Sequence, residues 1–287
     1  MARPTTVVSH DMRLPALLCL VMFAFAANSL LTRAGVAEGT DPLSFALIRV
    51  MTGAATLAMI AWASRGLPPL TGRDRALASL ALTVYLFGFS LAYLTLDAGV
   101  GALILFAVVQ IGLFAGALMT GEVIGPRRWL GMGLALAALT WLLWPGSAAQ
   151  ISLTGALWMG LGGLGWALYT WLGRSEAWAL GGTAGNFLWA SLAVFLLWIP
   201  FGGPVTWLGT TYAAASGIVA SGLGYALWFH VLPQIKATTA GIAQLTVPVI
   251  ALILGAVLLR EPIGFETALA CGLVLAGVAL ATMKTRA

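Results

Sequence analysis

Four polar side chains lie inside stretches of sequence that are otherwise almost purely apolar. Arg49 stands in the middle of SFALIRVMTG, within the apolar run 42–63, and the amides Asn28, Gln110 and Gln244 are placed in the same way in other runs. Amides offer hydrogen-bond donors and acceptors, and a guanidinium binds a carboxylate, so these groups could bind the charged ends of an amino acid. Hydrogen bonds between helices are the alternative role for the amides, and the residues alone leave both roles open.

Aromatic side chains gather in three of the apolar runs and could line a cavity for an apolar substrate. Packing within the protein and contact with lipid are the alternatives for each of them. The aromatic residues that we assign to this cavity are Tyr85, Phe89, Trp166, Tyr169 and Tyr225.

Other kinds of chemistry find little support in the sequence. The two histidines are far apart and no Cys-x-x-Cys is present, so we expect no metal ion and no other cofactor. The serines of ASGIVASGLG have neither a Gly-x-Ser-x-Gly motif nor a histidine or aspartate beside them, so we do not expect an enzyme. The absence of a ring of charges and of a pore-loop motif argues against a channel. Scattered basic residues argue against binding to nucleic acid.

The composition indicates that the chain folds in a membrane. Its residues are 61% hydrophobic and 8% charged, far from the roughly 25% charged residues of soluble domains. A helix needs about 20 apolar residues to cross the hydrocarbon core. We therefore predict an all-α integral membrane protein with ten transmembrane helices. The ten runs are 14–34, 43–63, 75–95, 98–120, 127–145, 152–173, 182–201, 207–231, 236–259 and 264–283.

The distribution of basic residues predicts the orientation of these helices. With ten spans and a cytoplasmic N-terminus, eleven of the fourteen basic residues fall on the inner side and two on the outer side, while Arg49 lies within a span. This bias follows the positive-inside rule and predicts a bacterial inner-membrane protein with both termini in the cytoplasm. An alternative is that RLPALLCLVMFAFAAN is a cleaved leader, which would leave nine spans.

The two halves of the chain resemble each other. Residues 98–137 match residues 237–276 at fourteen of 40 positions, including an ungapped Glu-x-Ile-Gly that begins at Glu122 and at Glu261. Each half contains five spans, so the second would be inverted relative to the first. We therefore predict two inverted five-helix repeats, 1–145 and 146–287, around a central cavity, an architecture typical of alternating-access transporters. The alternative is a duplicated scaffold without a transport role.

Several residues could contribute to gating of such a cavity. Gly112 and Gly116 would allow close helix crossing, Pro248 would interrupt a helix, and Glu261 lies at a span end. Arg49 lies roughly 10 Å below the outer end of its span at about 1.5 Å per residue. It could extend its guanidinium to the outer surface, pair with an outer carboxylate as a gate, or bind the carboxylate of a substrate.

Three segments resemble the EamA-domain drug/metabolite transporters. They are DPLSFALIR at 41–49, AGIAQLTVPVIALILGAVLLREPI at 240–263, and AFAANSLLTRAG with Asn28. The resemblance covers essentially the whole chain and implies ten helices around a central cavity. It also implies a transporter of amino acids or small metabolites, the YddG-type aromatic amino-acid exporters being among its members.

We therefore expect an alternating-access exporter of aromatic or other apolar amino acids, or of similar metabolites. The predicted spans have no carboxylate in their middle thirds, which favours facilitated diffusion or exchange over proton coupling. The alternative is an efflux transporter for multiple drugs or lipophilic cations, which could be proton-coupled. We expect a small-molecule substrate and membrane lipid as partners, no nucleic acid, and a chain that can act as a monomer.

Overall fold

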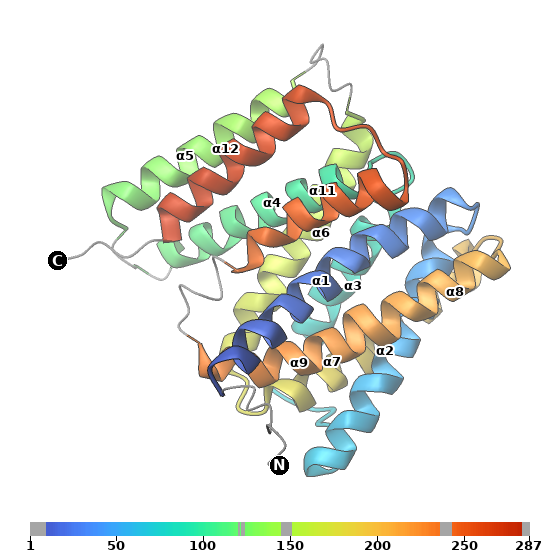
Figure 1. Ribbon diagram of the computed structural model, residues 1–287. Helices are drawn as coiled ribbons and strands as arrows, with labels where there is room; N and C mark the ends of the chain where they lie inside the picture. Colours follow the sequence, from blue (N-terminus) through green and yellow to red (C-terminus); the bar gives the residue numbers. More distant parts are fainter. Residues whose placement is uncertain (1–9, 120, 122–123, 145–150, 236–242, 283–287) are drawn as a thin grey trace, which may run out of the picture.

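The ten apolar runs form helices wherever the chain is described. The computed structural model describes residues 10–119, 121, 124–144, 151–235 and 243–282, and no strand occurs among them (Figure 1). The α-helices are α1 (His10–Ala37), α2 (Pro42–Arg65), α3 (Arg75–Ala92), α4 (Ala98–Met119), α5 (Pro126–Leu142), α6 (Leu153–Leu172), α7 (Ala179–Phe201), α8 (Trp207–Ala215), α9 (Gly224–Val231), α11 (Thr246–Leu258) and α12 (Phe265–Thr282). A π-helix, η2 (Ser216–Leu223), joins α8 to α9, and the short 3₁₀ turns η1 (Gly173–Ser175) and η3 (Leu232–Gln234) follow α6 and α9.

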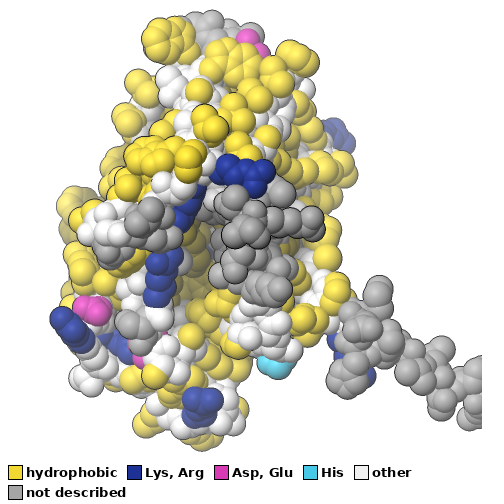
Figure 2. All heavy atoms as spheres, turned by 90° about the vertical axis from the view of Figure 1, so that its left-hand side faces the viewer, with side chains coloured by type: hydrophobic (Ala, Val, Ile, Leu, Met, Phe, Trp, Pro, Cys, Tyr) yellow, Lys and Arg dark blue, Asp and Glu magenta, His cyan; other side chains and the backbone are white. Residues whose placement is uncertain are grey.

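Several of these helices have the length and apolar composition of membrane-spanning helices. Six helical segments among the described residues are long and apolar enough to cross one, and α11 and α12 are shorter apolar helices. Large apolar side chains also cover the outside, with Trp207 86% and Phe265 80% exposed. Seen from the side at which α4 ends and α5 begins, the surface is mainly hydrophobic, with more Lys and Arg than Asp and Glu (Figure 2). The count of ten spans stays a prediction.

Part of the DPLSFALIR segment has a structural role at a helix start. The Asp41 side chain accepts a hydrogen bond from the Ser44 backbone N–H at 2.9 Å, and Pro42 occupies the first turn of α2. Aspartate satisfies a backbone donor that the helix leaves free, and proline tolerates this position because its missing N–H is not needed there. The family-like motif therefore begins with helix-capping chemistry.

Helices that are equivalent in the two halves pack directly against each other. The pairs α2 with α7, α4 with α11, and α5 with α12 are all in contact. Other large contacts follow the same relation: α3 packs against α6 as α1 packs against the α8–η2–α9 segment, and α4 packs against α6 as α11 packs against α1. An exchange of the two halves thus preserves the main helix contacts.

The helices of these three equivalent pairs run antiparallel. In the α5–α12 pair, Gly131 lies beside Ala281 and Ala135 lies beside Gly277. Between α2 and α7, Ser44 contacts Trp198 and Gly53 lies beside Phe187, so residue numbers rise along one helix as they fall along the other. Between α4 and α11, Ala98 lies beside Gly255 and Gly99 beside Leu252. This is the packing that an inverted repeat requires. The inversion relative to a membrane stays a prediction.

Some of the residues used for the sequence predictions are not covered by the structure. The basic residues Arg3, Lys236, Lys284 and Arg286, and the repeat residue Glu122, lie outside the described residues. The segment that resembles a leader forms the first part of α1, which packs against α11, α9 and η2 and buries Val21 and Ala26 completely.

The close contact between α5 and α12 can be tested with two glycines of the same helix. A methyl group at Gly131 would meet the Gly277 carbonyl oxygen and the Ala281 nitrogen, whereas one at Gly133 would meet nothing. Gly131→Ala should lower stability by about 1–3 kcal/mol through overpacking. Gly133→Ala should be neutral or stabilising by up to about 1 kcal/mol through helix propensity. Thermal unfolding of the purified variants in detergent measures both, and equal unfolding temperatures would contradict the predicted contact.

Candidate substrate-binding cavity

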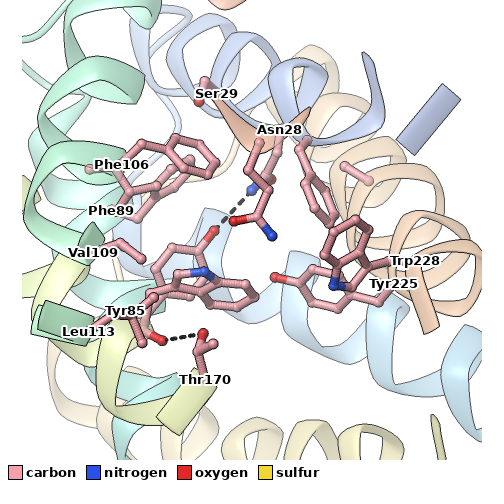
Figure 3. Close-up of a pocket in the computed structure, with 15 residues that line it drawn as sticks. Asn28, Ser29, Tyr85, Phe89, Phe106, Val109, Leu113, Thr170, Tyr225 and Trp228 are labelled. Carbon is pink, nitrogen blue, oxygen red and sulfur yellow. Dashed lines mark hydrogen bonds between the residues drawn. The ribbon is translucent and has the colours of Figure 1, made fainter. Parts of the chain in front are cut away.

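A cavity lies between the helices of both halves. It encloses about 680 Å³ of space, its open mouth included, and its walls come from α1, α3, α4, α6, η2, α9 and the residues before α11. The lining residues are Phe25, Asn28, Ser29, Tyr85, Phe89, Leu105, Phe106, Val109, Leu113, Trp166, Thr170, Ala220, Tyr225, Trp228 and Gln244 (Figure 3).

Two pairs of lining residues are equivalent in the two repeats. The offset of 139 residues that aligns the halves relates Phe89 to Trp228 and Leu105 to Gln244. Equivalent positions therefore face one common space, as expected if the cavity lies between the two repeats.

Six of the residues predicted from the sequence line this cavity. They are Asn28, Tyr85, Phe89, Trp166, Tyr225 and Gln244. The residues that sequence reasoning missed on α4 are spaced by four, Leu105, Val109 and Leu113, and so share one helix face. Their spacing would have identified them only after the inward face of α4 was known, because apolar side chains do not differ chemically from those that face lipid.

The aromatic side chains form a continuous wall. The ring of Trp166 stacks on that of Tyr225, with centroids 5.4 Å apart and planes at 23°, and lies 4.9 Å from the ring of Tyr85. Phe25 makes edge contacts with Tyr225 and Trp228 at 5.6 and 6.0 Å. Such a wall offers a planar or apolar side chain a large contact area.

A chain of hydrogen bonds lies beside the aromatic wall. The Ser216 hydroxyl donates to Asn28 Oδ1 at 2.6 Å, and Asn28 Nδ2 donates to the Tyr85 hydroxyl at 3.1 Å. Arg49 Nη2 also donates to the Tyr85 hydroxyl at 2.9 Å, and Arg49 Nε donates to Ser221 Oγ at 3.3 Å. The chain therefore connects α1, α2, α3 and η2 at the centre of the bundle.

The π-helix explains how two serines reach this hydrogen-bond chain. Ser216 and Ser221 are five residues apart and both belong to η2. In a π-helix hydrogen bonds join residues five apart, so these positions lie near the same side, which they would not do in an α-helix. One serine therefore meets Asn28 and the other meets Arg49.

Arg49 is fully buried at the centre of the bundle. Its exposed fraction is 0%, and its guanidinium carbon lies 5.0 Å from the centre of the Phe89 ring and 5.3 Å from that of the Tyr85 ring. The side chain therefore does not extend to the outer surface, and that interpretation was wrong. The sequence could not exclude this interpretation, because the position of a residue along a helix gives its depth in the membrane but not the direction in which its side chain points.

Glu261 joins three elements at one end of the bundle. Its carboxylate accepts hydrogen bonds from the Ala98 N–H at the start of α4, at 2.9 and 3.1 Å, and from Arg33 Nε at 3.3 Å. Arg33 also lies 3.7 Å from Asp97 and donates to the Tyr93 carbonyl oxygen at 3.0 Å. These contacts tie α1 to α4 and to the α11–α12 connection. They also show that Glu261 pairs with Arg33 and not with Arg49.

The surroundings of Glu261 disfavour its charge. Burial raises the pKa of the carboxyl, and the neighbouring Asp97 carboxylate raises it further, although the Ala98 N–H and Arg33 act in the opposite direction. The net result is a pKa above the ordinary glutamate value.

Besides Arg49, which lies behind the wall, two predicted binding residues do not line the cavity. Gln110 is partly exposed and lies outside the lining. Tyr169 is buried, donates its hydroxyl hydrogen to Thr183 or accepts one from it at 3.1 Å, and packs behind Trp166 with ring centres 5.4 Å apart. Tyr169 therefore supports the aromatic wall from outside the cavity.

The predicted gating residues on α4 are sites of close helix contact. A side chain at Gly112 would meet Ala167, and one at Gly116 would meet the Trp171 ring, both on α6. The two glycines thus let α4 approach α6, and motion at this crossing stays a prediction.

Pro248 lies just after an interruption of the helical backbone. The chain is helical at 243–244, turns at Leu245, and becomes helical again from Thr246. Proline lacks the N–H that would bond the carbonyl four residues before it, which is that of Gln244. The interruption therefore falls next to Gln244, whose side chain lines the cavity.

Comparison with known proteins agrees with this architecture. The EamA-like transporter family matches the chain twice, over residues 14–144 and 153–283. A Pseudomonas aeruginosa protein described as uncharacterized is 44% identical over 273 residues, 94% of this chain and 94% of that protein. An Archaeoglobus fulgidus protein described as an uncharacterized transporter is 27% identical over 288 residues, 93% of this chain and 96% of that protein. A crystal structure with 18% identity has a TM-score of 0.68 and covers 95% of this chain and 98% of its own, which shows a shared fold.

An apolar helical bundle around an internal cavity is the architecture of a multi-pass membrane transporter. Because the two matches cover most of its length, the chain belongs to the EamA-like transporter family. The family resemblance of the sequence is thus confirmed, and the YddG-type subgroup stays a prediction.

The raised pKa of Glu261 gives a testable pH dependence. Because the fold favours the protonated carboxyl, stability should fall as the pH rises from about 4.5 through the raised pKa of Glu261. Glu261→Gln should remove this part of the pH dependence and should not lower the unfolding temperature at neutral pH. Melting curves in detergent between about pH 4 and 8 measure the effect.

The exposed Glu38 provides the control for this measurement. Glu38→Gln should show the same pH profile as the parent chain. A Glu261→Gln profile that also matches the parent would contradict the electrostatic description of this end of the bundle.

Proposed function

We propose that this chain exports small apolar or aromatic amino acids, or metabolites of similar shape, from the cytoplasm by alternating access. The observation that carries the proposal is the aromatic cavity at the centre of the bundle, with Trp166 stacked on Tyr225. Aromatic walls accept an apolar side chain, and the amides Asn28 and Gln244 offer polar contacts to the other end of the molecule.

The two-fold packing supports the alternating-access part of the proposal. Antiparallel contact between equivalent helices would let the two halves, 1–145 and 146–287, exchange roles as inverted repeats. In the conformation described here, the contacts of Glu261 with Arg33 and Ala98 hold one end together. We propose that these contacts must separate for that end to open, with Gly112, Gly116 and Pro248 at the points that move.

The charge distribution supports a cytoplasmic location for the opposite end. The exposed residues Arg65, Arg127 and Arg174 lie at the ends of α2 and α6 and at the start of α5, and the positive-inside rule favours the cytoplasmic side for an end rich in arginine. We therefore propose a bacterial inner-membrane protein of ten spans with cytoplasmic termini, in which Glu261 closes the outer end.

Facilitated diffusion or exchange agrees best with the cavity lining. None of the lining residues among the described part of the chain is acidic. A carboxylate in the cavity could carry the coupling proton or bind a lipophilic cation, so both of these functions would favour an acidic lining residue. Efflux of multiple cationic drugs is therefore the competing outcome of the transport experiment.

Flux in proteoliposomes tests the proposed function. The full-length protein should carry labelled phenylalanine or leucine saturably, at a rate that an imposed pH gradient does not change. Flux of cationic drugs that collapses when the pH gradient is removed would contradict the proposal and support the competing function.

Two tryptophans of α6 connect the flux to the cavity. Trp166 lines the cavity, whereas Trp158 is 39% exposed on the outside of the same helix. Trp166→Ala should reduce phenylalanine flux by about tenfold, since an aromatic contact is worth roughly 0.5–1.5 kcal/mol beyond the area that it buries. Trp158→Ala is the matched control and should retain the parental flux. Equal loss in both variants would contradict the assignment of the cavity.

A further inference from the structure

The positive charge of Arg49 is not balanced by the described protein. The side chain is completely buried, its Nη1 atom has no hydrogen-bond partner, and no acidic side chain among the described residues forms an ion pair with it. A guanidinium stays protonated under all ordinary conditions. Two aromatic faces and two hydroxyl groups compensate only part of the cost of burying this charge. An anion close to Arg49 would therefore be stabilised strongly.

The cavity is the place from which an anion can approach Arg49. Tyr85 and Phe89 line the cavity and contact the guanidinium, so Arg49 lies directly behind this wall. The Tyr85 hydroxyl accepts hydrogen bonds from Arg49 and Asn28, so it meets a ligand in the cavity as a donor. The hydroxyl of Tyr225 points into the same space (Figure 3). A carboxylate bound by Tyr85 would lie two hydrogen bonds from the guanidinium.

The cavity offers much less to a positive charge. Its described lining has no carboxylate, and the side-chain oxygen of Asn28 already accepts from Ser216. Only neutral groups remain for an ammonium group, namely the Gln244 amide, the hydroxyls of Ser29, Thr170 and Tyr225, and the aromatic faces. The two ends of an amino acid would thus meet unequal partners, the carboxylate a buried charge and the ammonium uncharged groups.

We propose that the cavity binds its substrate through a carboxylate, held by the Tyr85 hydroxyl with Arg49 behind it, and that the amino group is dispensable. The substrate class is then aromatic and apolar monocarboxylates, of which amino acids are one kind. The proposal names the substrate class of the transport site and rests on the proposed function for the statement that such molecules are carried. The alternative is a purely structural Arg49 that links α2, α3 and η2.

A matched set of ligands separates these alternatives. L-Phenylalanine and 3-phenylpropionate carry the carboxylate, whereas L-phenylalaninamide and phenethylamine lack it. In proteoliposomes containing the full chain, 3-phenylpropionate should inhibit labelled phenylalanine flux at least ten times more strongly than phenethylamine or the amide. Inhibition by the amide that equals inhibition by the acid would overturn the proposal.

Two tyrosines provide matched variants for the same measurement. Tyr85→Phe keeps the ring but removes the hydroxyl, and it should weaken inhibition by 3-phenylpropionate about tenfold while leaving inhibition by phenethylamine unchanged. Tyr169→Phe removes a buried hydroxyl outside the cavity and should keep the parental ratio between acid and amine. A parental ratio in Tyr85→Phe would show a structural role for the Arg49–Tyr85 contact and overturn the proposal.

Thermal stabilisation of the purified protein distinguishes failure of this proposal from failure of the proposed function. 3-Phenylpropionate should raise the unfolding temperature of the parent chain and of Arg49→Lys, which keeps the charge, but much less that of Tyr85→Phe. If proteoliposomes carry none of these compounds while this pattern is found, the anion site stands and the proposed function fails. If phenylalanine is carried but the acid stabilises no better than the amide, the anion site fails and the proposed function stands.

Discussion

The arrangement of the bundle centre depends on one buried guanidinium. Arg49 has no surface exposure, so its charge and donors must be met by groups that other helices bring to it. The Tyr85 hydroxyl comes from α3 and the Ser221 hydroxyl from η2, which means that two other segments converge on one side chain of α2. The π-helix and its close contact with α2 are understandable as the backbone geometry that brings Ser216 and Ser221 to this point. The same convergence leaves a positive charge directly behind the cavity wall.

The paired packing of equivalent helices places this centre between the two halves of the chain. Contacts of α2 with α7, α4 with α11, and α5 with α12 are antiparallel, and the helices that line the cavity come from both repeats. Phe89 and Trp228 occupy equivalent positions but differ in size, and Leu105 and Gln244 differ in polarity. The halves thus share a framework of helix packing, while their differences give the cavity one aromatic wall and one charged side. The proposed substrate, with its unlike ends, would match this asymmetry.

Much of the fold was predictable because lipid imposes a simple length and composition on each helix. The apolar runs, the repeat, and cavity residues such as Asn28 and Tyr85 stand out against an apolar background. The role of Arg49 did not, because position along a helix gives depth but not the direction of its face. Gln110 and Gln244 are the same residue type in repeat-related segments, at positions that are near but not equivalent, and only Gln244 lines the cavity, next to the helix interruption before Pro248. The lining residues Leu105 and Val109 resemble any lipid-facing residue until α4 is packed, and the π-helix has no known signature in the sequence.

The central claim is that the cavity receives a carboxylate at the wall in front of Arg49. An experimental structure of the protein with 3-(4-bromophenyl)propionate tests it most directly, because the anomalous signal of bromine fixes the direction in which the ligand lies. We predict the carboxylate within hydrogen-bond distance of the Tyr85 hydroxyl and the brominated ring against the aromatic wall of Trp166 and Tyr225. A ligand bound in the reverse direction, with bromine at Tyr85 and the carboxylate at Thr170, would contradict the claim.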